Sequence, residues 1–460
     1  MDLHYLELLQ IADLLRRRDV TSVEVTRAQF DRIDRLDGHL ASYARTMPDH
    51  ALGEAATADA EIAAGRYRGP LHGVPLGVKD LFWTKGVPAA AGTMIHRNFV
   101  PEEDATVVAR LREAGAILLG KLEMTEGAYS DHHPAITPPK NPWNAAYWTG
   151  ISSSGPAAAT AAGLCYGALA SDTGGSIRWP CGATGLTGIK PAWGRVSRFG
   201  VFELAASLDH VGPVARSAAD AAAILAAVAG PDDKDPTTLA EPRPDHVGSA
   251  GSIGGLRLGI DAQWNSVDVD PSVQRTLADA EGVLRSLGAE IVPVSVPDVT
   301  QAVVDWGPAC ALEAAVAHRA TYPARKSEYG PVLSSVLEAG RAVAAFDYQA
   351  IQLRRLALRG RFSHLLLTID ALLVPVQPFA PLTLADISTL GAQPDLILKL
   401  QRYTAPFDLT GHPTVTLPGG FSERDVPIGL QLAGRDETML IRAAVAFQHE
   451  TSWHKRHPLP

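Results

Sequence analysis

Two serines and one lysine lie in three short segments whose residue types could carry out nucleophilic chemistry. Ser176 lies in DTGGSIR (residues 172–178), Ser152 precedes it by 24 positions (176 − 152 = 24) in TGISSSG (149–155), and Lys79 lies in GVPLGVKD (73–80). A serine hydroxyl becomes a good nucleophile only when a neighbouring base takes its proton. The three segments could therefore supply a nucleophile, a proton relay and a base.

Lys79 ends the short apolar run 76–78, which predicts a buried strand. Burial disfavours the charged form of a lysine. To act as a base near neutral pH, its pKa must fall from about 10.4 toward roughly 7 to 8, which corresponds to about 4 kcal/mol. The alternative is a structural pair between Lys79 and the adjacent Asp80.

The serine-rich segment around Ser152 precedes an alanine-rich helix expected to begin near Ala157. Its hydroxyls could cap that helix, or the segment could be a flexible Gly/Ser linker. The third segment differs, because a strand end at 168–171 leads into a turn without bulky side chains at 173–176. Backbone N–H groups in such a turn are free to converge on an oxyanion. The phosphate-binding patterns GxxxxGK[ST] and GxGxxG do not occur here.

No GxSxG elbow surrounds Ser176, and the sequence does not show whether a histidine approaches it. The adjacent pair His132 and His133 lacks the spacing of a metal motif such as HExxH, so we expect a loop or a pocket wall there. The cysteines Cys165, Cys181 and Cys310 have no CxxC spacing, and free buried thiols are expected.

Composition indicates a folded globular protein, with 46% hydrophobic and 20% charged residues in 460. Length alone allows two or three average domains or one large α/β domain. The net charge of −9 and the short Lys/Arg clusters disfavour a nucleic-acid groove. Because no signal peptide and no run of about 18 apolar residues occurs, we expect a cytoplasmic protein without a membrane partner.

Strand and helix patterns alternate along the chain, which predicts an α/β sheet covered by helices on both faces. A capping box of Thr21 and Glu24 opens the second of two N-terminal helices. The stretch 231–255 reads as a surface connection. The remaining expected elements are helices at 6–18, 104–114 and 271–287, mostly helical structure over 303–366, and strands at 116–119, 256–260, 290–294, 371–375, 414–417 and 429–432.

Taken together, the three segments resemble the amidase signature family. The resemblance continues through the motifs GIKP (188–191), GRVS (194–197), SLD (207–209), GP (212–213), GHP (411–413) and GLQL (429–432). It implies one compact α/β domain over 1–460, built around a single large mixed β-sheet core, with no metal or cofactor. Within it we distinguish N-terminal helices (1–68), a signature core (69–230), the surface connection (231–255) and the rest of the sheet with the substrate pocket (256–460).

Carried over residue by residue, the resemblance makes Ser176 the nucleophile, Lys79 the neutral base and Ser152 the bridging serine, which has a cis peptide bond in the family. The resemblance also implies an oxyanion hole formed by backbone N–H groups of Thr173, Gly174 and Gly175. Asp172 and Arg178 are expected to support these groups without reacting.

The sequence departs from the family pattern next to the bridging serine, where Ile151 stands in place of a common glycine and Pro156 in place of a small polar residue. Aromatic residues lie close by, at Trp179 and at Tyr147 and Trp148. We expect the substrate to be selected by the loop 129–139 and by residues 374–378. The residues expected to bind it are Tyr129, Gly150, Ile151 and Trp179.

The resemblance implies a hydrolase that cleaves C–N bonds of small amides. The aromatic residues and the likeness to urethane-cleaving members extend the expected range to anilides and carbamates. The alternative is the glutaminase component of a tRNA-dependent amidotransferase complex, whose motifs are similar. A third interpretation, a binding scaffold with a relic site, is disfavoured because all three reactive side chains are present. The expected partner is a small-molecule amide or carbamate.

Overall fold

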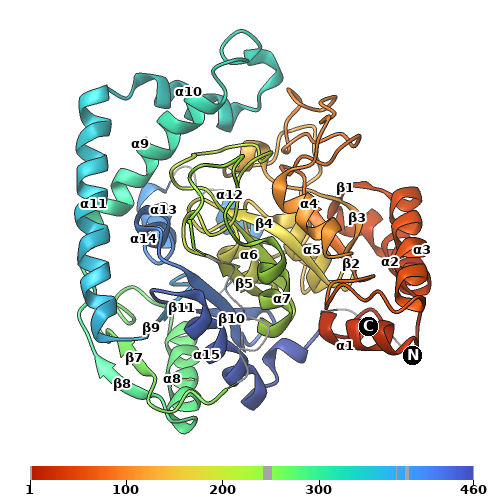
Figure 1. Ribbon diagram of the computed structural model, residues 1–460. Helices are drawn as coiled ribbons and strands as arrows, with labels where there is room; N and C mark the ends of the chain where they lie inside the picture. The colour runs from red at the N-terminus through yellow and green to blue at the C-terminus, as the bar shows by residue number, and fades with distance from the viewer. Residues whose placement is uncertain (1–2, 242–250, 380, 389–392, 459–460) are drawn as a thin grey trace.

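A single mixed β-sheet forms the centre of the molecule in the computed structural model, which describes residues 3–241, 251–379, 381–388 and 393–458. Eleven strands of these residues join in the order β1-β3-β2-β4-β6-β5-β10-β11-β9-β7-β8 (Figure 1). The strands are β1 Tyr43–Thr46, β2 Pro75–Lys79, β3 Ile117–Leu122, β4 Gly167–Asp172, β5 Thr187–Lys190, β6 His210–Ala215, β7 Arg257–Ile260, β8 Glu290–Pro293, β9 Ala371–Pro375, β10 Thr414–Phe421 and β11 Pro427–Ala433. The predicted fold class is confirmed.

Helices cover both faces of this sheet. Residues of β4 that point to opposite faces contact different helices. Ala170 packs in one apolar cluster with Ala157 and Ala161 of α5, whereas a Cβ at Gly167 would lie 2.6 Å from Ile224 of α7. Neighbouring side chains of a strand point to opposite faces. The α-helices are α1 Leu8–Arg17, α2 Ser22–Leu40, α3 Pro48–Ala63, α4 Thr106–Glu113, α5 Ser154–Ala161, α6 Arg178–Thr184, α7 Ala218–Val228, α8 Pro271–Ser286, α9 Thr300–Ala317, α10 Pro331–Ala342, α11 Ala345–Thr368, α12 Leu384–Ser388, α13 Pro394–Gln401, α14 Ala405–Thr410 and α15 Glu437–Glu450.

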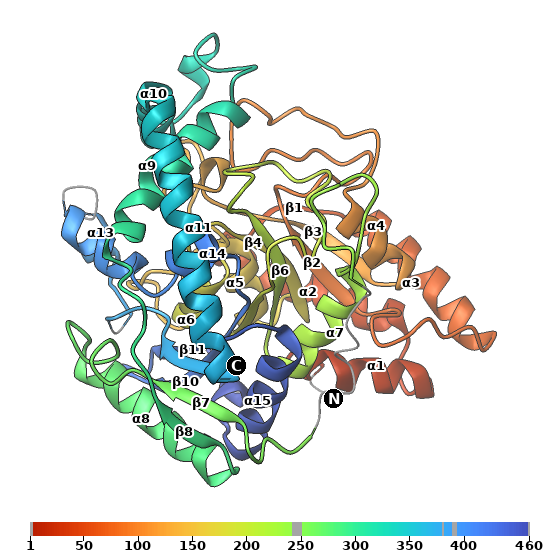
Figure 2. The same ribbon diagram turned by 60° about the vertical axis from the view of Figure 1, so that its left-hand side comes forward.

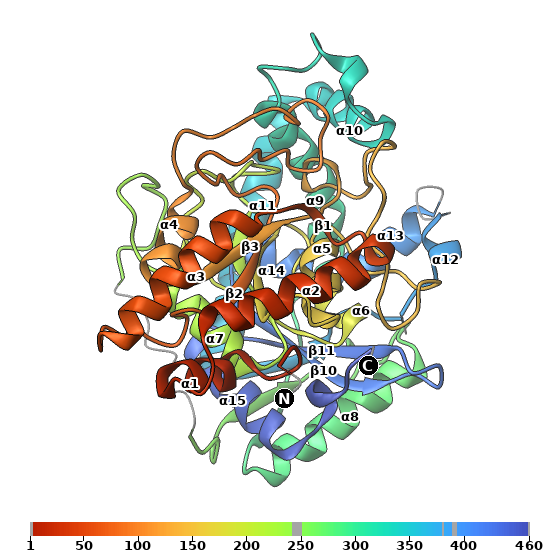
Figure 3. The ribbon, with the colours of Figure 1, turned by 90° about the vertical axis from the view of Figure 1, so that its right-hand side faces the viewer.

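The N-terminal helices lie over the β2–β3 end of the sheet (Figure 3). Helix α2 begins where its capping box predicts, since Thr21 accepts from the N–H of Glu24 and the Glu24 carboxylate accepts from the N–H of Thr21. The strand β1 and helix α3 that follow were not predicted. Helix α3 is rich in alanine and weakly amphipathic, so its pattern carries little periodic signal.

The predicted β-helix-β unit is confirmed at the opposite end of the sheet, where β7 and β8 pair in parallel and α8 connects them (Figure 2). The described parts of the connection at 231–255, residues 231–241 and 251–255, contain no helix or strand, and 242–250 lie outside the described residues. Strands come from the segments 1–68, 69–230 and 256–460, but the division into these segments stays a prediction. Among the described residues, no helix combines the length and apolarity needed to cross a membrane.

Helices α9, α10 and α11 form a group beside the sheet, at the upper left of Figure 1. Helices α9 and α10 pack closely, because a Cβ at Gly340 would lie 1.9 Å from the carbonyl oxygen of Ala311. The start of α10 is held by Glu126, whose two carboxylate oxygens accept from the N–H of Gly330 at 2.9 and 3.0 Å. This contact fixes α10 beside the loop that follows Glu126.

Candidate active site

Lys79 lies at the end of β2 with its side chain fully buried. Its ammonium nitrogen donates to three serine hydroxyls, those of Ser152 at 2.8 Å, Ser171 at 2.9 Å and Ser153 at 3.0 Å. Strand β2 pairs in parallel with β3 and β4, so its last residue faces the end of β4, where Ser171 lies. The structure thus brings Lys79 and Ser152 into direct contact.

Burial lowers the pKa of Lys79 from its ordinary value of 10.5 to about 7, although the negative charges of Asp172 and Asp209 oppose the shift. The alternative pairing of Lys79 with Asp80 is wrong. The Asp80 carboxylate instead contacts the Nζ of Lys121 at 3.4 Å. Lys79 therefore has no carboxylate within ion-pair distance among the described residues.

Ser152, Ser153 and Ser154 do not cap α5, which begins at Ser154. The N-cap residue is Ser153, and its side chain accepts no hydrogen bond from the helix. Its hydroxyl donates to the carbonyl oxygen of Ser171 at 3.2 Å, and the hydroxyl of Ser154 lies 3.0 Å from the Nε2 of His132. The peptide bond between Ile151 and Ser152 is cis. The capping and linker interpretations are therefore wrong, because these side chains face inward.

Ser176 lies in the turn between β4 and α6, 7% exposed, in the wall of a cavity. No described residue forms a hydrogen bond with its hydroxyl. The turn requires glycine beside it: Gly175 has φ +135°, and a Cβ at Gly174 would lie 2.6 Å from the ring of Trp306. The turn thus packs directly against Trp306, which lines the same cavity.

The backbone N–H groups of this turn divide into two sets. The N–H of Gly175 donates to the Asp172 carboxylate at 2.7 Å, and the N–H of Ile177 donates to it at 2.9 Å. The Thr173 hydroxyl donates to Asp209 at 2.6 Å. The N–H groups of Thr173, Gly174 and Ser176 have no acceptor among the described residues, which leaves them available for a bound oxygen.

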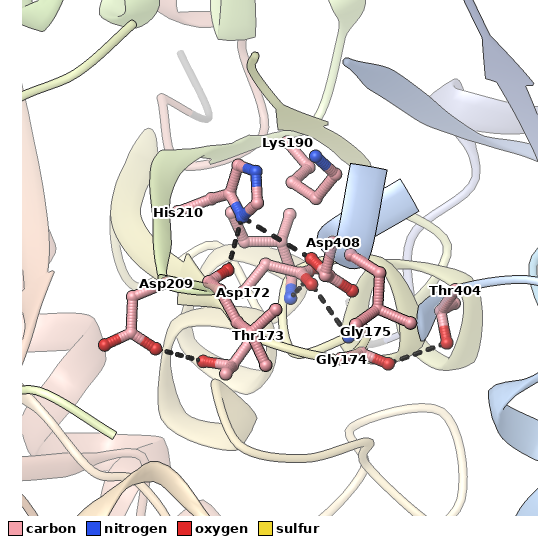
Figure 4. A network of polar contacts seen from close by, with 12 residues as sticks. Asp172, Thr173, Gly174, Gly175, Lys190, Asp209, His210, Thr404 and Asp408 are labelled. Atoms are coloured by element: carbon pink, nitrogen blue, oxygen red, sulfur yellow. Dashed lines mark hydrogen bonds and ion pairs between the residues drawn. The ribbon is translucent and has the colours of Figure 1, made fainter. Parts of the chain in front are cut away.

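A buried ionic network lies behind the turn (Figure 4). The Arg178 guanidinium donates to Asp172 at 2.8 Å and to Asp408 at 2.6 Å, and all three side chains are fully buried. Burial acts to raise the pKa of Asp172, but the charge and hydrogen bonds of Arg178 outweigh it and hold that pKa far below its usual range. Asp172 is thus an ionised anchor for the turn, in the supporting position expected for it and Arg178.

The cavity has a volume of about 720 Å³ and a largely apolar, aromatic wall. Of the predicted substrate-binding residues, Tyr129, Ile151 and Trp179 line it. Gly150 does not, since its α-carbon packs against the backbone of Pro180. The lining residues of known placement are Ala128, Tyr129, Ser130, Asp131, Trp148, Ile151, Thr173, Gly174, Ser176, Trp179, Leu204, Trp306, Pro331, Val332, Ser335, Val336, Leu384, Ile387, Ser388, Ile397, Leu400 and Gln401.

The two loops expected to select the substrate contribute unequally to this wall. Residues 129–131 of the first loop line the cavity, and none of 374–378 does. Val376 instead packs behind the wall against Trp148 and Trp179. Helices α10, α12 and α13 supply much of the remaining surface, which the sequence motifs did not indicate.

Sequence reasoning also missed Ser153, Ser171 and Trp306. A signal existed for Ser171, because it directly precedes Asp172 at the end of a predicted strand. Trp306 carried none, since it lies in α9 outside every motif. The three cysteines are free and buried, as expected. No group of three potential metal ligands occurs within the described part of the chain.

Comparisons with known proteins identify the family of the chain. The sequence profile of the Amidase family matches residues 24–440. AmiD of Mycobacterium tuberculosis, which carries an amidase name, is 49% identical over 98% of this chain and 96% of its own length. A glutamyl-tRNA(Gln) amidotransferase component of Geobacter sulfurreducens is 40% identical over 99% of both chains.

Among solved structures, the peptide amidase of Stenotrophomonas maltophilia superimposes with a TM-score of 0.83 and 28% identity, covering 97% of this chain and 96% of its own. The profile match extends over nearly the whole chain, and relatives well above 30% identity cover almost all of it. The chain therefore belongs to the amidase signature family and is a hydrolase of carbon–nitrogen bonds.

Proposed function

We propose that this enzyme hydrolyses small amides through an acyl-enzyme on Ser176, with Lys79 as the base and Ser152 as the relay between them. The observation that carries the proposal is the 2.8 Å hydrogen bond between Lys79 and Ser152 in a fully buried site. A lysine whose pKa is lowered to about 7 is largely neutral just above neutral pH and accepts a proton there.

The reaction begins when the Ser176 oxygen attacks the carbonyl carbon of the amide. The Ser176 hydroxyl first turns toward Ser152, with which it forms no hydrogen bond in the structure. Its proton then passes to the Ser152 oxygen, and the Ser152 proton passes to the neutral amine of Lys79. The negative charge on the former carbonyl oxygen is stabilised by the N–H groups of this turn, where one such donor contributes about 10²–10³ in rate. We keep Thr173 and Gly174 in the expected oxyanion hole, add Ser176, and assign Gly175 to holding the turn.

The C–N bond then breaks, and the departing nitrogen takes a proton from the Lys79 ammonium through Ser152. The amine leaves, and the acyl group stays on Ser176. Water attacks the acyl carbon, gives its proton to the same relay, and the acid leaves as Ser176 recovers its proton. Each half-reaction returns the relay to its starting state, so no other reactant is needed.

Anilides and aryl carbamates belong to the proposed range. The cavity beside Ser176 is walled by Trp148, Trp179 and Trp306, and flat aromatic groups pack well on such surfaces. The alternative substrate, glutamine, carries a carboxylate that must be paired when it is buried. None of the described lining residues is a lysine or an arginine, which disfavours the glutaminase alternative.

The assignment of the nucleophile is tested by intact mass spectrometry after treatment with a serine-directed phosphonate probe. We expect one added probe on the native enzyme and none on Ser176→Ala. Ser335→Ala is the matched control, because Ser335 lines the same cavity from α10 and should leave labelling unchanged. Labelling that persists in Ser176→Ala would refute the assigned nucleophile.

The relay is tested by comparing Ser152→Ala with Ser153→Ala, since both remove a hydroxyl bonded to Lys79. We expect the first to reduce the labelling rate at least a hundredfold and the second to reduce it less. Amine release from an anilide and from an aryl carbamate tests the substrate range. Release from neither compound would rule out this range.

A further inference from the structure

The charge of the cavity wall is carried by one residue. Among the described residues that line the cavity, Asp131 alone has a charged side chain. The Ser130 hydroxyl donates to its carboxylate at 3.0 Å, and the carbonyl oxygen of Asp131 accepts from the N–H of Glu126 at 2.8 Å. Among the described residues, no lysine or arginine forms an ion pair with the Asp131 carboxylate. The carboxylate is thus held at an exposed position of the wall with its charge uncompensated.

The neighbouring residue His132 does not neutralise this charge. Burial lowers the pKa of His132 to about 4, so its ring is neutral near pH 7. Its Nε2 lies 3.0 Å from the hydroxyl of Ser154, on the side of the serine segment. Asp131 is therefore open to pair with a positive charge on a bound molecule.

Aromatic rings border the same part of the cavity. Tyr129 and Trp306 lie nearly parallel, with an interplanar angle of 15° and ring centroids 6.5 Å apart. Trp306 is held in place because its Nε1 donates to the carbonyl oxygen of Thr173 at 2.8 Å. Aromatic faces attract cations, and a carboxylate beside them adds a charge partner. This combination is the chemistry that recognises an alkylammonium group.

We propose that Asp131 is a specificity residue that favours amides carrying a protonated amine over neutral and anionic amides of the same shape. The proposal rests on the proposed function, because it assigns a charge preference to the same cavity. An anionic substrate meets the Asp131 carboxylate without a compensating cation, whereas a cationic one meets both the carboxylate and the Tyr129 and Trp306 rings.

The test uses matched compounds that differ in charge. Acetanilides with a 4-aminomethyl, 4-hydroxymethyl or 4-carboxymethyl group place the charge on the amine side of the scissile bond, and the corresponding benzamides place it on the acyl side. We expect the native enzyme to show the highest kcat/KM for the cationic member of at least one series. Asp131→Asn should lower the cationic-to-neutral ratio about fivefold, as expected for one partly exposed ion pair.

Two control variants distinguish the effect of the charge at position 131 from the effect of the net charge of the protein. Asp131→Glu keeps the charge and should keep most of the preference. Asp34→Asn makes the same charge change on an exposed residue of α2 outside the cavity wall and should leave the ratio unchanged. Raising the salt concentration should weaken the preference of the native enzyme, because exposed charges are screened.

Calorimetric titration of the same compounds into Ser176→Ala, with and without Asp131→Asn, measures the preference without turnover. A charge preference in binding that Asp131→Asn removes supports the proposal even if no compound is hydrolysed, an outcome that would count against the proposed function alone. Equal cationic-to-neutral ratios in the native enzyme and Asp131→Asn, in both hydrolysis and binding, would overturn the assignment of Asp131.

Discussion

Replacing Lys79 by methionine should make the enzyme inactive and, at neutral pH, more stable. The side chain is fully buried, and its pKa falls from 10.5 to about 7 on folding. Between these two pH values the unfolded chain binds one more proton than the folded chain. The free energy of unfolding of the native enzyme therefore rises with pH across this window, and the burial penalty is fully present at about pH 7 and below.

The size of the effect follows from the same pKa values. The gap between 10.5 and about 7 corresponds to about 5 kcal/mol, at about 1.4 kcal/mol for each pH unit. Methionine removes this penalty but also three hydrogen bonds to serines, each contributing about 1 kcal/mol. We expect Lys79→Met to raise the free energy of unfolding by about 2 kcal/mol at pH 7.

The change of this stability difference with pH is the better test. A packing change caused by the substitution contributes equally at both pH values and therefore cancels. Urea denaturation of both proteins at pH 7 and pH 9 should show that the advantage of about 2 kcal/mol for Lys79→Met at pH 7 is lost by pH 9, because the native enzyme gains up to about 1.4 kcal/mol for each pH unit in this window. Lys85→Met is the control, as this lysine is exposed and its ammonium stays in water. A stability difference that stays constant from pH 7 to 9 would refute the lowered pKa of Lys79.

Two further predictions concern the same site. The kcat/KM for a neutral anilide should rise about tenfold per unit below pH 7 and level off above it, because Lys79 acts as a base only when deprotonated; a pH-rate profile that is flat between pH 5.5 and 8 would contradict this. Asp172→Asn leaves Arg178 buried with a weakened partner and should lower the free energy of unfolding by about 3 to 5 kcal/mol, and a loss below about 1 kcal/mol in urea denaturation would argue against the anchoring role.

The strand ends and tight turns around Lys79 and Ser176 could be predicted because they depend on local patterns. A short apolar run ending in a lysine, and a strand followed by two glycines, specify both the element and its end. The same local reasoning failed for the serine segment near Ser152. Capping is a local interaction, whereas the Ser152 hydroxyl accepts a hydrogen bond from Lys79. These two residues lie 73 positions apart in the sequence.

The cavity wall could not be predicted, because it is assembled from distant segments. Trp306 reaches the active-site turn through a hydrogen bond to Thr173 across 133 positions of sequence. The substrate contact of Gly150 stays a prediction, but Gly150 does not line the cavity, and its missing side chain admits the backbone of Pro180. Such close approaches depend on how helices pack on the finished sheet.

The three serine hydroxyls around Lys79 match the hydrogen-bonding capacity of its charged form but not that of its neutral form. An ammonium group offers three protons and suits three accepting oxygens, whereas a neutral amine offers two protons and one lone pair. Deprotonated Lys79 therefore requires one of its three hydroxyls to turn and donate. The Ser153 proton is already engaged with the carbonyl oxygen of Ser171, which leaves Ser152 and Ser171. Loss of a single proton thus reorients a hydroxyl at one of two positions, and Ser152 is one of them.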